Sequence, residues 1–353
     1  MTLKDQLIAQ IAAQGPMRID AYMQTCLLHP THGYYTTAAP FGRAGDFVTA
    51  PEISQMFGEL IGLCLAQHWL ASGAPAPFTL AEMGPGRGTL MADALRACRA
   101  VPGLVEAASM VLVEASPALR EVQRATLDGV AATWVDTAED LPEAPLFLIA
   151  NEFFDALPLR QFVRSGNGWR ERQIGVTEGT LSFGLGPVQP QPALAPRLED
   201  TQEGDMIEDR SMAAPIMAEI TRRIDSFGGG ALIVDYGDWR TLGDTFQAVA
   251  DHAATDPLAH PGAADLTAHV DFETLAAASA PCLHTRVTPQ GVFLERLGIT
   301  QRARKLAERL EGAALEEHIA AHRRLTHPSE MGNLFKVMGI YPQGGTPPPG
   351  LEP

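Results

Sequence analysis

The sequence is poor in the features that mark secreted and membrane proteins. Its four cysteines, Cys26, Cys64, Cys98 and Cys282, lie far apart and form no C-x-x-C pair. Buried free thiols in a reducing compartment are therefore expected, rather than a disulfide framework. No run approaches the ~18 apolar residues that a membrane-spanning helix needs. The first residues, Met1–Leu7, lack a basic region followed by an apolar run, so no secretory signal is evident. These absences predict a cytoplasmic protein without membrane insertion.

Basic residues are also scarce. The 26 Lys and Arg residues stand against 42 Asp and Glu residues, which gives a net charge of −16. This balance opposes non-specific binding to nucleic acid or anionic lipid. It suits a small cationic or zwitterionic ligand, or a protein partner with a basic patch. A hydrophobic fraction of 46% with 19% charged residues is ordinary for a globular chain, so collagen-like, disordered and coiled-coil classes are excluded.

Short apolar runs alternate with helical patterns from residue 78 onward. The runs with the length and composition of buried strands are 78–81, 110–114, 146–150 and 231–235. Helices are predicted over 89–100 and from Ser116-Pro117, where a hydroxyl cap precedes proline at the first helical position. Strands that alternate with helices in this way predict an α/β fold with a mostly parallel sheet covered on both faces.

Residues 1–75 are predicted to form an N-terminal helical region. Helical patterns cover 3–14 and 20–28, and a third helix is predicted over 50–71. Thr49 and Glu52 have the spacing of a capping box at its start, with Pro51 in the first turn.

Two stretches of the remaining chain interrupt the alternation. Residues 159–210 contain a hairpin pattern around 165–168 followed by a proline-rich segment, and residues 236–290 are irregular. We therefore expect a core over 76–353 with insertions at these two places, near the carboxyl ends of the strands, where substrate selectivity is usually built.

A glycine-rich turn, Glu82-Met83-Gly84-Pro85-Gly86-Arg87-Gly88, follows the first strand. Glycine allows backbone N–H groups to approach a ligand closely at the start of a helix. The spacing is G-x-G-x-G, whereas dinucleotide-binding turns have G-x-G-x-x-G. Glu82 would repel a pyrophosphate but attract the ammonium group of a methionine moiety. The turn therefore predicts S-adenosylmethionine as the cofactor, held by Glu82, Gly84, Gly86 and Gly88.

Two further acids follow in phase with the glycine turn. Glu114 ends the next strand, where an acid can accept hydrogen bonds from both ribose hydroxyls of a nucleoside. Asp136 comes after the apolar residues 133–135, at the position for a contact near the adenine. Both are predicted cofactor residues.

A polar and aromatic stretch, Asn151–Pro158, follows the fourth strand of the alternating core. Several enzymes that methylate amines and amides place an Asn or Asp, aromatic residues and a proline there. Such groups hold and desolvate an N–H donor while its lone pair attacks the methyl group. A helix cap followed by core aromatics is the alternative interpretation of this stretch.

Seven stretches carry a resemblance that extends over nearly the whole chain. They are 33–35, 45–55, the glycine turn 82–88, 151–158, 235–237, 264–272 and 332–337. In this order they resemble the MidA-like methyltransferases, whose eukaryotic members are mitochondrial complex I assembly methyltransferases. The resemblance implies a class I methyltransferase fold: a Rossmann-like sheet of seven strands, the last antiparallel, with an N-terminal helical extension and inserted substrate-binding elements.

The resemblance also implies an activity and a set of residues. The activity is methylation of arginine side chains in a protein, with the 49-kDa-type subunit of respiratory complex I as the family target and complex assembly as the role. By position, the residues Gly45, Asp46 and Thr49 would belong to a loop that closes over the cofactor, and Asn151, Glu152 and Asp155 would be catalytic. Glu152 is the first candidate, because carboxylates must hold a guanidinium and localise its charge away from the attacking nitrogen. Tyr236, Asp265 and His269 would contact the substrate, with a structural hydrogen-bond donor as the alternative role of His269.

Other functions stay open at this point. The acceptor could be another protein or a small-molecule nitrogen, since organisms without complex I must use something else. A non-catalytic assembly chaperone is disfavoured by the presence of both Glu82 and Glu114. A NAD-dependent oxidoreductase is disfavoured by Glu82 and by the missing sixth-position glycine. His318 and His322 have metal-ligand spacing but lack the intervening general-base glutamate of H-E-x-x-H, so no metal is expected.

Overall fold

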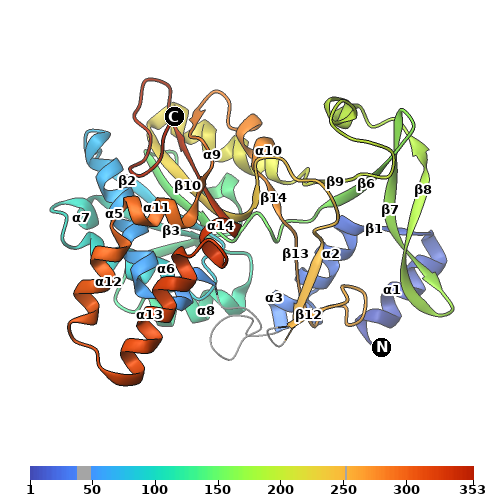
Figure 1. The fold of residues 1–353 in the computed structure, drawn as a ribbon, viewed down its shortest axis with the longest axis horizontal. Coiled ribbons are helices and arrows are strands. Elements are labelled where there is room, and N and C mark those ends of the chain that lie inside the picture. The colour runs from blue at the N-terminus through green and yellow to red at the C-terminus, as the bar shows by residue number, and fades with distance from the viewer. Residues whose placement is uncertain (38–48, 251–252) are drawn as a thin grey trace.

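A mixed sheet forms the centre of the larger of two lobes in the computed structural model, which describes residues 1–37, 49–250 and 253–353 (Figure 1). Its strands lie in the order β15-β17-β10-β5-β2-β3-β4. Their bounds are β2 (Phe78–Met83), β3 (Ala108–Val113), β4 (Ala132–Val135), β5 (Leu146–Asn151), β10 (Gly229–Asp238), β15 (Leu283–His284) and β17 (Phe335–Tyr341). Strand β17, the last in the chain, is antiparallel to β10, and the other pairings of the path from β10 to β4 are parallel. Two short strands, β14 (Val270–Asp271) and β16 (Thr288–Pro289), pair with β10 and β17 beside this path, so the sheet has nine strands and not the predicted seven. The predicted α/β fold with an antiparallel last strand is confirmed.

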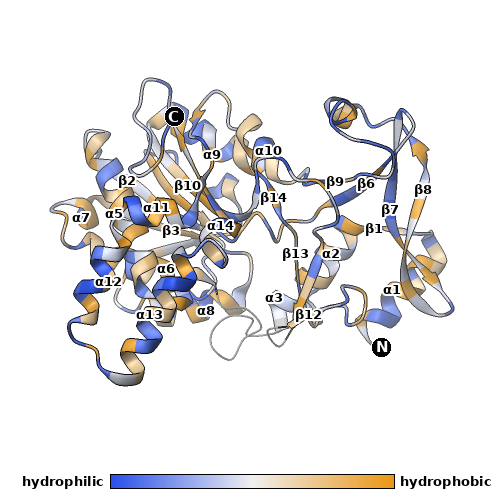
Figure 2. Ribbon diagram, viewed as in Figure 1, coloured by the Kyte–Doolittle hydropathy of each residue, from blue (hydrophilic) through white to orange (hydrophobic). Residues whose placement is uncertain are grey.

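Helices cover both faces of this sheet because its strands are apolar on both sides. In β5, Phe147 and Ile149 join one buried cluster, whereas Leu146, Leu148 and Ala150 join the other, as the alternation of side chains along a strand requires. The first cluster includes α5 (Gln55–Ala71), α6 (Thr89–Cys98), α11 (Gln290–Arg296) and α12 (Ile299–Ala307). The second includes α9 (Ala213–Phe227) and α10 (Phe272–Ala277). Figure 2 shows the apolar residues concentrated in the central strands between these layers.

The remaining elements of the larger lobe are short or peripheral. They are α4 (Ala50–Ile53), α7 (Leu104–Ala107), α8 (Pro117–Thr126), α13 (Gly312–Thr326), α14 (Met331–Leu334), the 3-10 turn Ala138–Asp140, β14 (Val270–Asp271) and β16 (Thr288–Pro289). On α13, His318 Nε2 lies 2.9 Å from the Ala303 carbonyl oxygen, and His322 Nε2 lies 3.1 Å from Thr300 Oγ1. The two histidines therefore fasten α13 to α12.

The smaller lobe combines the N-terminal helices with the inserted strands. It contains α1 (Leu3–Gln14), β1 (Met17–Arg18), α2 (Ile19–Leu28), α3 (Tyr34–Thr37), β6 (Arg160–Ser165), β7 (Gly168–Thr177), β8 (Thr180–Gln189), the 3-10 segment Pro192–Leu198, β9 (Met206–Asp209), β11 (Gln247–Ala250), β12 (Ala253–Thr255) and β13 (Asp265–Thr267). The predicted hairpin is confirmed, since Ser165 pairs with Gly168. Strand β1 pairs with β7, so the N-terminal segment completes the inserted sheet and shares one apolar core with it.

The predicted helix over 50–71 is wrong as a single element. The chain breaks at Ser54, where φ is −160° and ψ is 136°, and α5 begins one residue later. One hydrogen bond accounts for the break, and a second explains why the predicted capping box does not form. Ser54 Oγ accepts from Met56 N at 3.2 Å and so caps α5, while the Glu52 carboxylate accepts from Thr89 Oγ1 at 2.5 Å instead of closing a capping box with Thr49.

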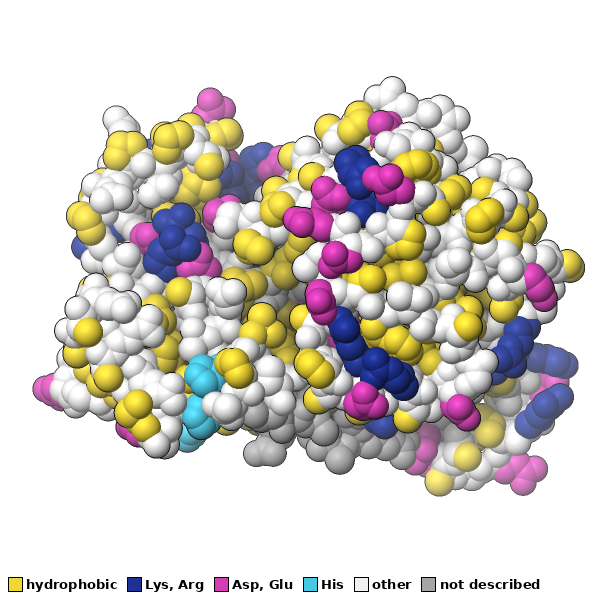
Figure 3. Space-filling view, turned by 180° about the vertical axis from the view of Figure 1, so that it is seen from behind, with side chains coloured by type: hydrophobic (Ala, Val, Ile, Leu, Met, Phe, Trp, Pro, Cys, Tyr) yellow, Lys and Arg dark blue, Asp and Glu magenta, His cyan; other side chains and the backbone are white. Residues whose placement is uncertain are grey.

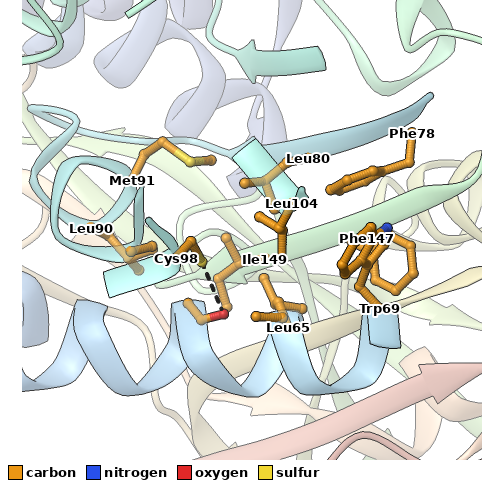
Figure 4. A pocket seen from close by; sticks show the side chains of 13 residues that line it. Leu65, Trp69, Phe78, Leu80, Leu90, Met91, Cys98, Leu104, Phe147 and Ile149 are labelled. Carbon is orange, nitrogen blue, oxygen red and sulfur yellow. Dashed lines mark hydrogen bonds between the residues drawn. The ribbon is translucent and has the colours of Figure 1, made fainter. Parts of the chain in front are cut away.

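Helices α5 and α6 pack so closely that their backbones leave no room for side chains at two glycines of α5. A Cβ on Gly58 would lie 2.7 Å from the Cβ of Asp93, and one on Gly62 would lie 2.6 Å from the Cα of Ala94. Cys98 Sγ donates to the Gly62 carbonyl oxygen across this contact at 3.3 Å. Figure 4 shows the apolar cavity beside it, with Leu65 and Trp69 of α5 pointing toward side chains of the strands. The contact places the start of α6 close to α4 and α5.

The four cysteines are buried free thiols, as the sequence predicts. Within the described ranges, no helix has both the length and the apolar character to cross a membrane. The same ranges contain no group of three or more His, Cys, Asp or Glu residues arranged to hold a metal ion.

We predict that Gly62→Ala destabilises the protein although alanine is the better helix former. The added methyl group overpacks the α5–α6 contact, which typically costs about 1–3 kcal/mol, against a gain of roughly 0.5–1 kcal/mol from helix propensity. Urea unfolding should show a net loss of about 1–2 kcal/mol. The control is Gln67→Ala on the exposed side of the same helix, which should change the free energy of unfolding by less than about 0.5 kcal/mol. Equal stability of Gly62→Ala and wild type would contradict the packing argument.

Candidate active site

A hollow opens where β2 and β5 end. Its lining residues come from the start of α4, the glycine turn, the start of α6 and the end of β5: Thr49, Pro51, Glu52, Glu82, Gly84, Pro85, Gly86, Arg87, Thr89, Leu90, Asn151 and Glu152. The structure thus brings predicted cofactor residues and predicted catalytic residues to one place at the carboxyl edge of the parallel strands, where ligands bind in open α/β sheets. The predicted cofactor residues Gly45 and Asp46 lie outside the described residues.

Glu82 is a buried carboxyl group at the floor of this hollow. It is 3% exposed, and its Oε2 atom has no hydrogen-bond partner among the described residues. Burial raises the pKa of Glu82 to about 8, because desolvation disfavours the charged form. An acid in this state favours a cationic ligand, whose charge would restore the ionised form.

The glycine turn adopts a backbone that side chains other than glycine rarely allow. Gly84, Gly86 and Gly88 have φ values of 57°, 53° and 81°, in the left-handed region. A Cβ on Gly84 would lie 2.9 Å from Cδ2 of Phe153. Gly88 is the N-cap of α6, so the first backbone N–H groups of this helix, its positive end, are close to the hollow.

Glu114 is held beside the glycine turn by a buried glutamine. Gln123 Nε2 donates to the Gly86 carbonyl oxygen at 2.8 Å and to Glu114 Oε2 at 3.2 Å, and its Oε1 atom accepts from Trp134 Nε1 at 2.8 Å. Ser116 N donates to Glu114 Oε1 at 2.7 Å. Burial raises the pKa of Glu114. Sequence analysis missed Gln123, whose only local signal is its place on the same face of α8 as the buried Leu119.

Asp136 follows β4, and 75% of its side chain is exposed. It pairs with Arg120, which also donates from Nε to the Glu114 carbonyl oxygen at 2.7 Å. One arginine therefore links the backbone of Glu114, after β3, to the side chain of Asp136, after β4. Both acids are predicted to contact the nucleoside part of the cofactor.

The turn after β5 carries the predicted catalytic residues in a strained backbone. Glu152 has φ of 50°, which is unusual for a residue with a side chain and marks functional sites in many proteins. The turn is held by Asp235, a fully buried carboxyl group on β10. Its Oδ2 atom accepts from Phe154 N at 3.0 Å and Asp155 N at 3.2 Å, and its Oδ1 atom accepts from Tyr236 N at 3.0 Å.

Burial raises the pKa values of both acids of this turn, Glu152 and Asp155. Burial raises the pKa of Glu152 to about 8, with further increases from the charges of Asp155 and Asp265. Burial likewise raises the pKa of Asp155 to about 6. Two acceptor atoms in this region, Asn151 Oδ1 and Asp155 Oδ1, are buried without hydrogen-bond partners among the described residues. The region is therefore rich in acceptors and poor in donors.

The charge of this region differs from that of the molecular surface. On the face in Figure 3, acidic and basic side chains lie next to one another. Arg240, for example, forms ion pairs with Asp200 and Glu273. In the site, the charge of Arg210 opposes the increase in the pKa values of Asp155 and Asp235. Its Nη1 and Nη2 atoms donate to the carbonyl oxygens of His269 at 2.6 Å and Ala268 at 2.5 Å.

The three predicted substrate residues lie around the same acids. Tyr236 is 3% exposed and lies between His269 and Phe335, with ring centroids 5.4 Å away on each side. Burial lowers the pKa of His269, which favours a neutral imidazole. Asp265 Oδ1 accepts from the Tyr35 hydroxyl at 2.7 Å.

Helix α4 connects the two halves of the site. Ala50 N, at its first turn, donates to Glu152 Oε1 at 3.0 Å. Glu52, in the same turn, binds Thr89 at the start of α6 and lies 3.8 Å from the guanidinium of Arg87. One short helix is thus fastened to the glycine turn and to the catalytic turn.

Known proteins resemble this chain over most of its length. The sequence model of a family described as "Putative S-adenosyl-L-methionine-dependent methyltransferase" matches residues 60–288. The chain is 36% identical to the mitochondrial protein arginine methyltransferase NDUFAF7 of Xenopus tropicalis, over 97% of this chain and 86% of that protein. It is 34% identical to the human protein of the same name, over 96% and 84%.

A solved structure agrees with these sequence relatives. A protein of Burkholderia thailandensis bound to S-adenosyl-homocysteine superposes with a TM-score of 0.83 and 30% identity, over 96% of this chain and 91% of that chain. The chain therefore belongs to this family of methyltransferases, and it is an enzyme that uses S-adenosylmethionine as its methyl donor.

Proposed function

We propose that this enzyme methylates arginine side chains of a protein. The observation that carries the proposal is the acceptor-rich region around Glu152, in the same hollow as the glycine turn. A guanidinium has five N–H donors in a planar fork and no acceptor, so it complements Glu152, Asn151 and Asp155. The relatives named as protein arginine methyltransferases support the same acceptor.

The residues of the glycine turn fit S-adenosylmethionine. Glu82 has an unpartnered buried oxygen for the ammonium of the methionine moiety. The start of α6 suits its carboxylate. Glu114 retains acceptor capacity for the ribose hydroxyls, since each of its oxygens accepts one protein donor. Asp136 is assigned to the adenine side, and Gly45, Asp46 and Thr49 to the cover of the site.

The chemistry of the acceptor half follows from its charge. The bound cofactor supplies an activated methyl group on a sulfonium. Glu152 and Asp155 hold the guanidinium, concentrate its positive charge on the bound nitrogens and orient the remaining nitrogen for attack. As this nitrogen gains the methyl group it loses a proton, which a carboxylate with the raised pKa of Glu152 is suited to accept. Tyr236, His269 and Asp265 enclose the acceptor and exclude water.

The identity of the acceptor protein is best found directly. A lysate of the source organism, with the gene for this enzyme deleted, is incubated with the purified enzyme and isotopically labelled cofactor. Mass spectrometry should find label on arginine of a protein, with the 49-kDa-type subunit of complex I as the first candidate. Label only on another residue type or on small molecules would overturn the proposal. The cytoplasmic location that the sequence suggests stays a prediction.

We predict that Glu82→Gln and Glu114→Gln each weaken binding of S-adenosylmethionine at least tenfold. Each removes a charge-assisted hydrogen bond, which contributes about 1.5–3 kcal/mol. Calorimetric titration measures the effect. Glu121→Gln on α8 is the matched control, since 75% of the Glu121 side chain is exposed and it pairs with Arg124 on the same helix. If all three variants bind equally well, the cofactor assignment is wrong.

We predict that Glu152→Gln lowers kcat at least 100-fold while cofactor affinity stays within threefold of wild type. Glutamine keeps an acceptor for Ala50 N but cannot neutralise a guanidinium or accept the proton. Glu143→Gln, at a side chain that is 69% exposed, is the control.

The pH dependence of the same reaction follows from the raised pKa of Glu152. Because the free enzyme holds a proton on Glu152 below about pH 8, kcat/KM for the acceptor should rise with pH between about 6.5 and 8.5. The rise should be absent in Glu152→Gln. A flat profile for wild type would contradict the assignment of Glu152 as the binding carboxylate.

A further inference from the structure

Tyr35 of α3 touches both halves of the site. Its hydroxyl donates to Asp265 Oδ1 at 2.7 Å, on the acceptor side. Its carbonyl oxygen accepts from Ser116 Oγ at 2.8 Å, on the cofactor side. The two partners are 149 positions apart in the chain and belong to different lobes, so this single residue fixes one against the other.

The cofactor-side contact is made next to Glu114. Ser116 donates its backbone N–H to Glu114 Oε1 at 2.7 Å, and its Oγ atom accepts from Leu119 N at 3.3 Å, which caps α8. The Ser116 hydroxyl has one proton, and that proton is directed to the Tyr35 carbonyl oxygen. The position of Tyr35 is therefore tied to the residue assigned to the ribose.

The acceptor-side contact is made within the group of acids. Asp265 is 5% exposed and its charge is felt at Glu152, while Tyr35 also feels the charge of Asp155. Burial and these negative charges raise the pKa of Tyr35 well above its ordinary value. The hydroxyl therefore keeps its proton and acts as a donor, which orients one oxygen of the Asp265 side chain.

We propose that Tyr35 is a positioning residue for methyl transfer: it orients the Asp265 carboxylate in the acceptor half and sets the distance of that carboxylate from the nucleoside end of the cofactor. The proposal takes arginine as the acceptor from the proposed function. The positioning role itself holds for any acceptor that Asp265 contacts. Small errors in the placement of reacting groups reduce rates strongly, so loss of one hydroxyl should be visible in kcat.

The test is a double-mutant cycle between Tyr35→Phe and Asp265→Asn in the full-length enzyme. Tyr35→Phe removes the donor but keeps the ring and the carbonyl oxygen that accepts from Ser116. It should lower kcat at least tenfold, with the affinity for S-adenosylmethionine within twofold of wild type. In the Asp265→Asn background the same change should lower kcat by less than threefold, because Tyr35 acts through Asp265.

Tyr22→Phe is the matched control. Its hydroxyl donates to the Pro257 carbonyl oxygen at 2.6 Å in the same lobe, away from the acids, so it should leave kcat within twofold of wild type even where it lowers stability. The rates are measured with the acceptor that wild type labels most strongly. If that acceptor is not arginine, the proposed function is wrong. The kcat values of the double-mutant cycle would still test the positioning role of Tyr35.

Three results would overturn the positioning role. The first is a Tyr35→Phe enzyme with wild-type kcat. The second is a full tenfold loss on addition of Tyr35→Phe to Asp265→Asn, which would show independent action. The third is a loss of cofactor affinity as large as the loss of kcat, which would assign Tyr35 to the structure of the cofactor half alone.

Discussion

The Asp235 carboxyl group organises the acceptor half of this enzyme. It lies where β10 reaches the carboxyl edge of the sheet, is fully buried, and accepts three backbone N–H groups. Two of these belong to the turn after the neighbouring strand β5. The bonds hold the turn in a shape in which Glu152 takes a left-handed backbone and Asp155 stays buried. Without such an anchor the strain at Glu152 would relax, and the direction of its carboxylate would be lost.

The same arrangement places several acids in one weakly solvated space. Burial raises the pKa values of Glu152, Asp155 and Glu82, and the charge of Asp155 raises the pKa of Glu152 further. A group whose pKa is raised in the folded state binds more protons folded than unfolded, so its contribution to stability falls as the pH rises between the two pKa values. At neutral pH these buried carboxyl groups therefore lower the stability of the ligand-free protein, and a bound cation would offset that cost. The ammonium of the cofactor is complementary to Glu82, and the guanidinium of the acceptor is complementary to Glu152 and Asp155.

The two halves need a fixed distance, and segments from the N-terminal part of the chain supply it. Helix α4 is bonded to Glu152 and, through Glu52, to the start of α6. Tyr35 joins Ser116 to Asp265. The close α5–α6 contact at Gly58 and Gly62 holds the glycine turn against the base of α4. The smaller lobe thus contributes to the site through Tyr35, which packs against the core that the N-terminal segment shares with the inserted strands.

Local sequence patterns determined the strands of the central sheet, the glycine turn and the acids at the strand ends. The apolar runs specify the strands, the glycines specify the turn after β2, and Glu114 and Glu152 are placed by their positions at strand ends, because strand periodicity and turn chemistry act over a few residues. The residues that tertiary structure alone revealed work over longer separations. Asp235 bonds a turn some 80 positions earlier, Gln123 joins the glycine turn to Glu114, and Glu52 binds Thr89 at the start of α6. No sequence pattern records such contacts, since their partners meet only when the sheet and the two lobes have assembled.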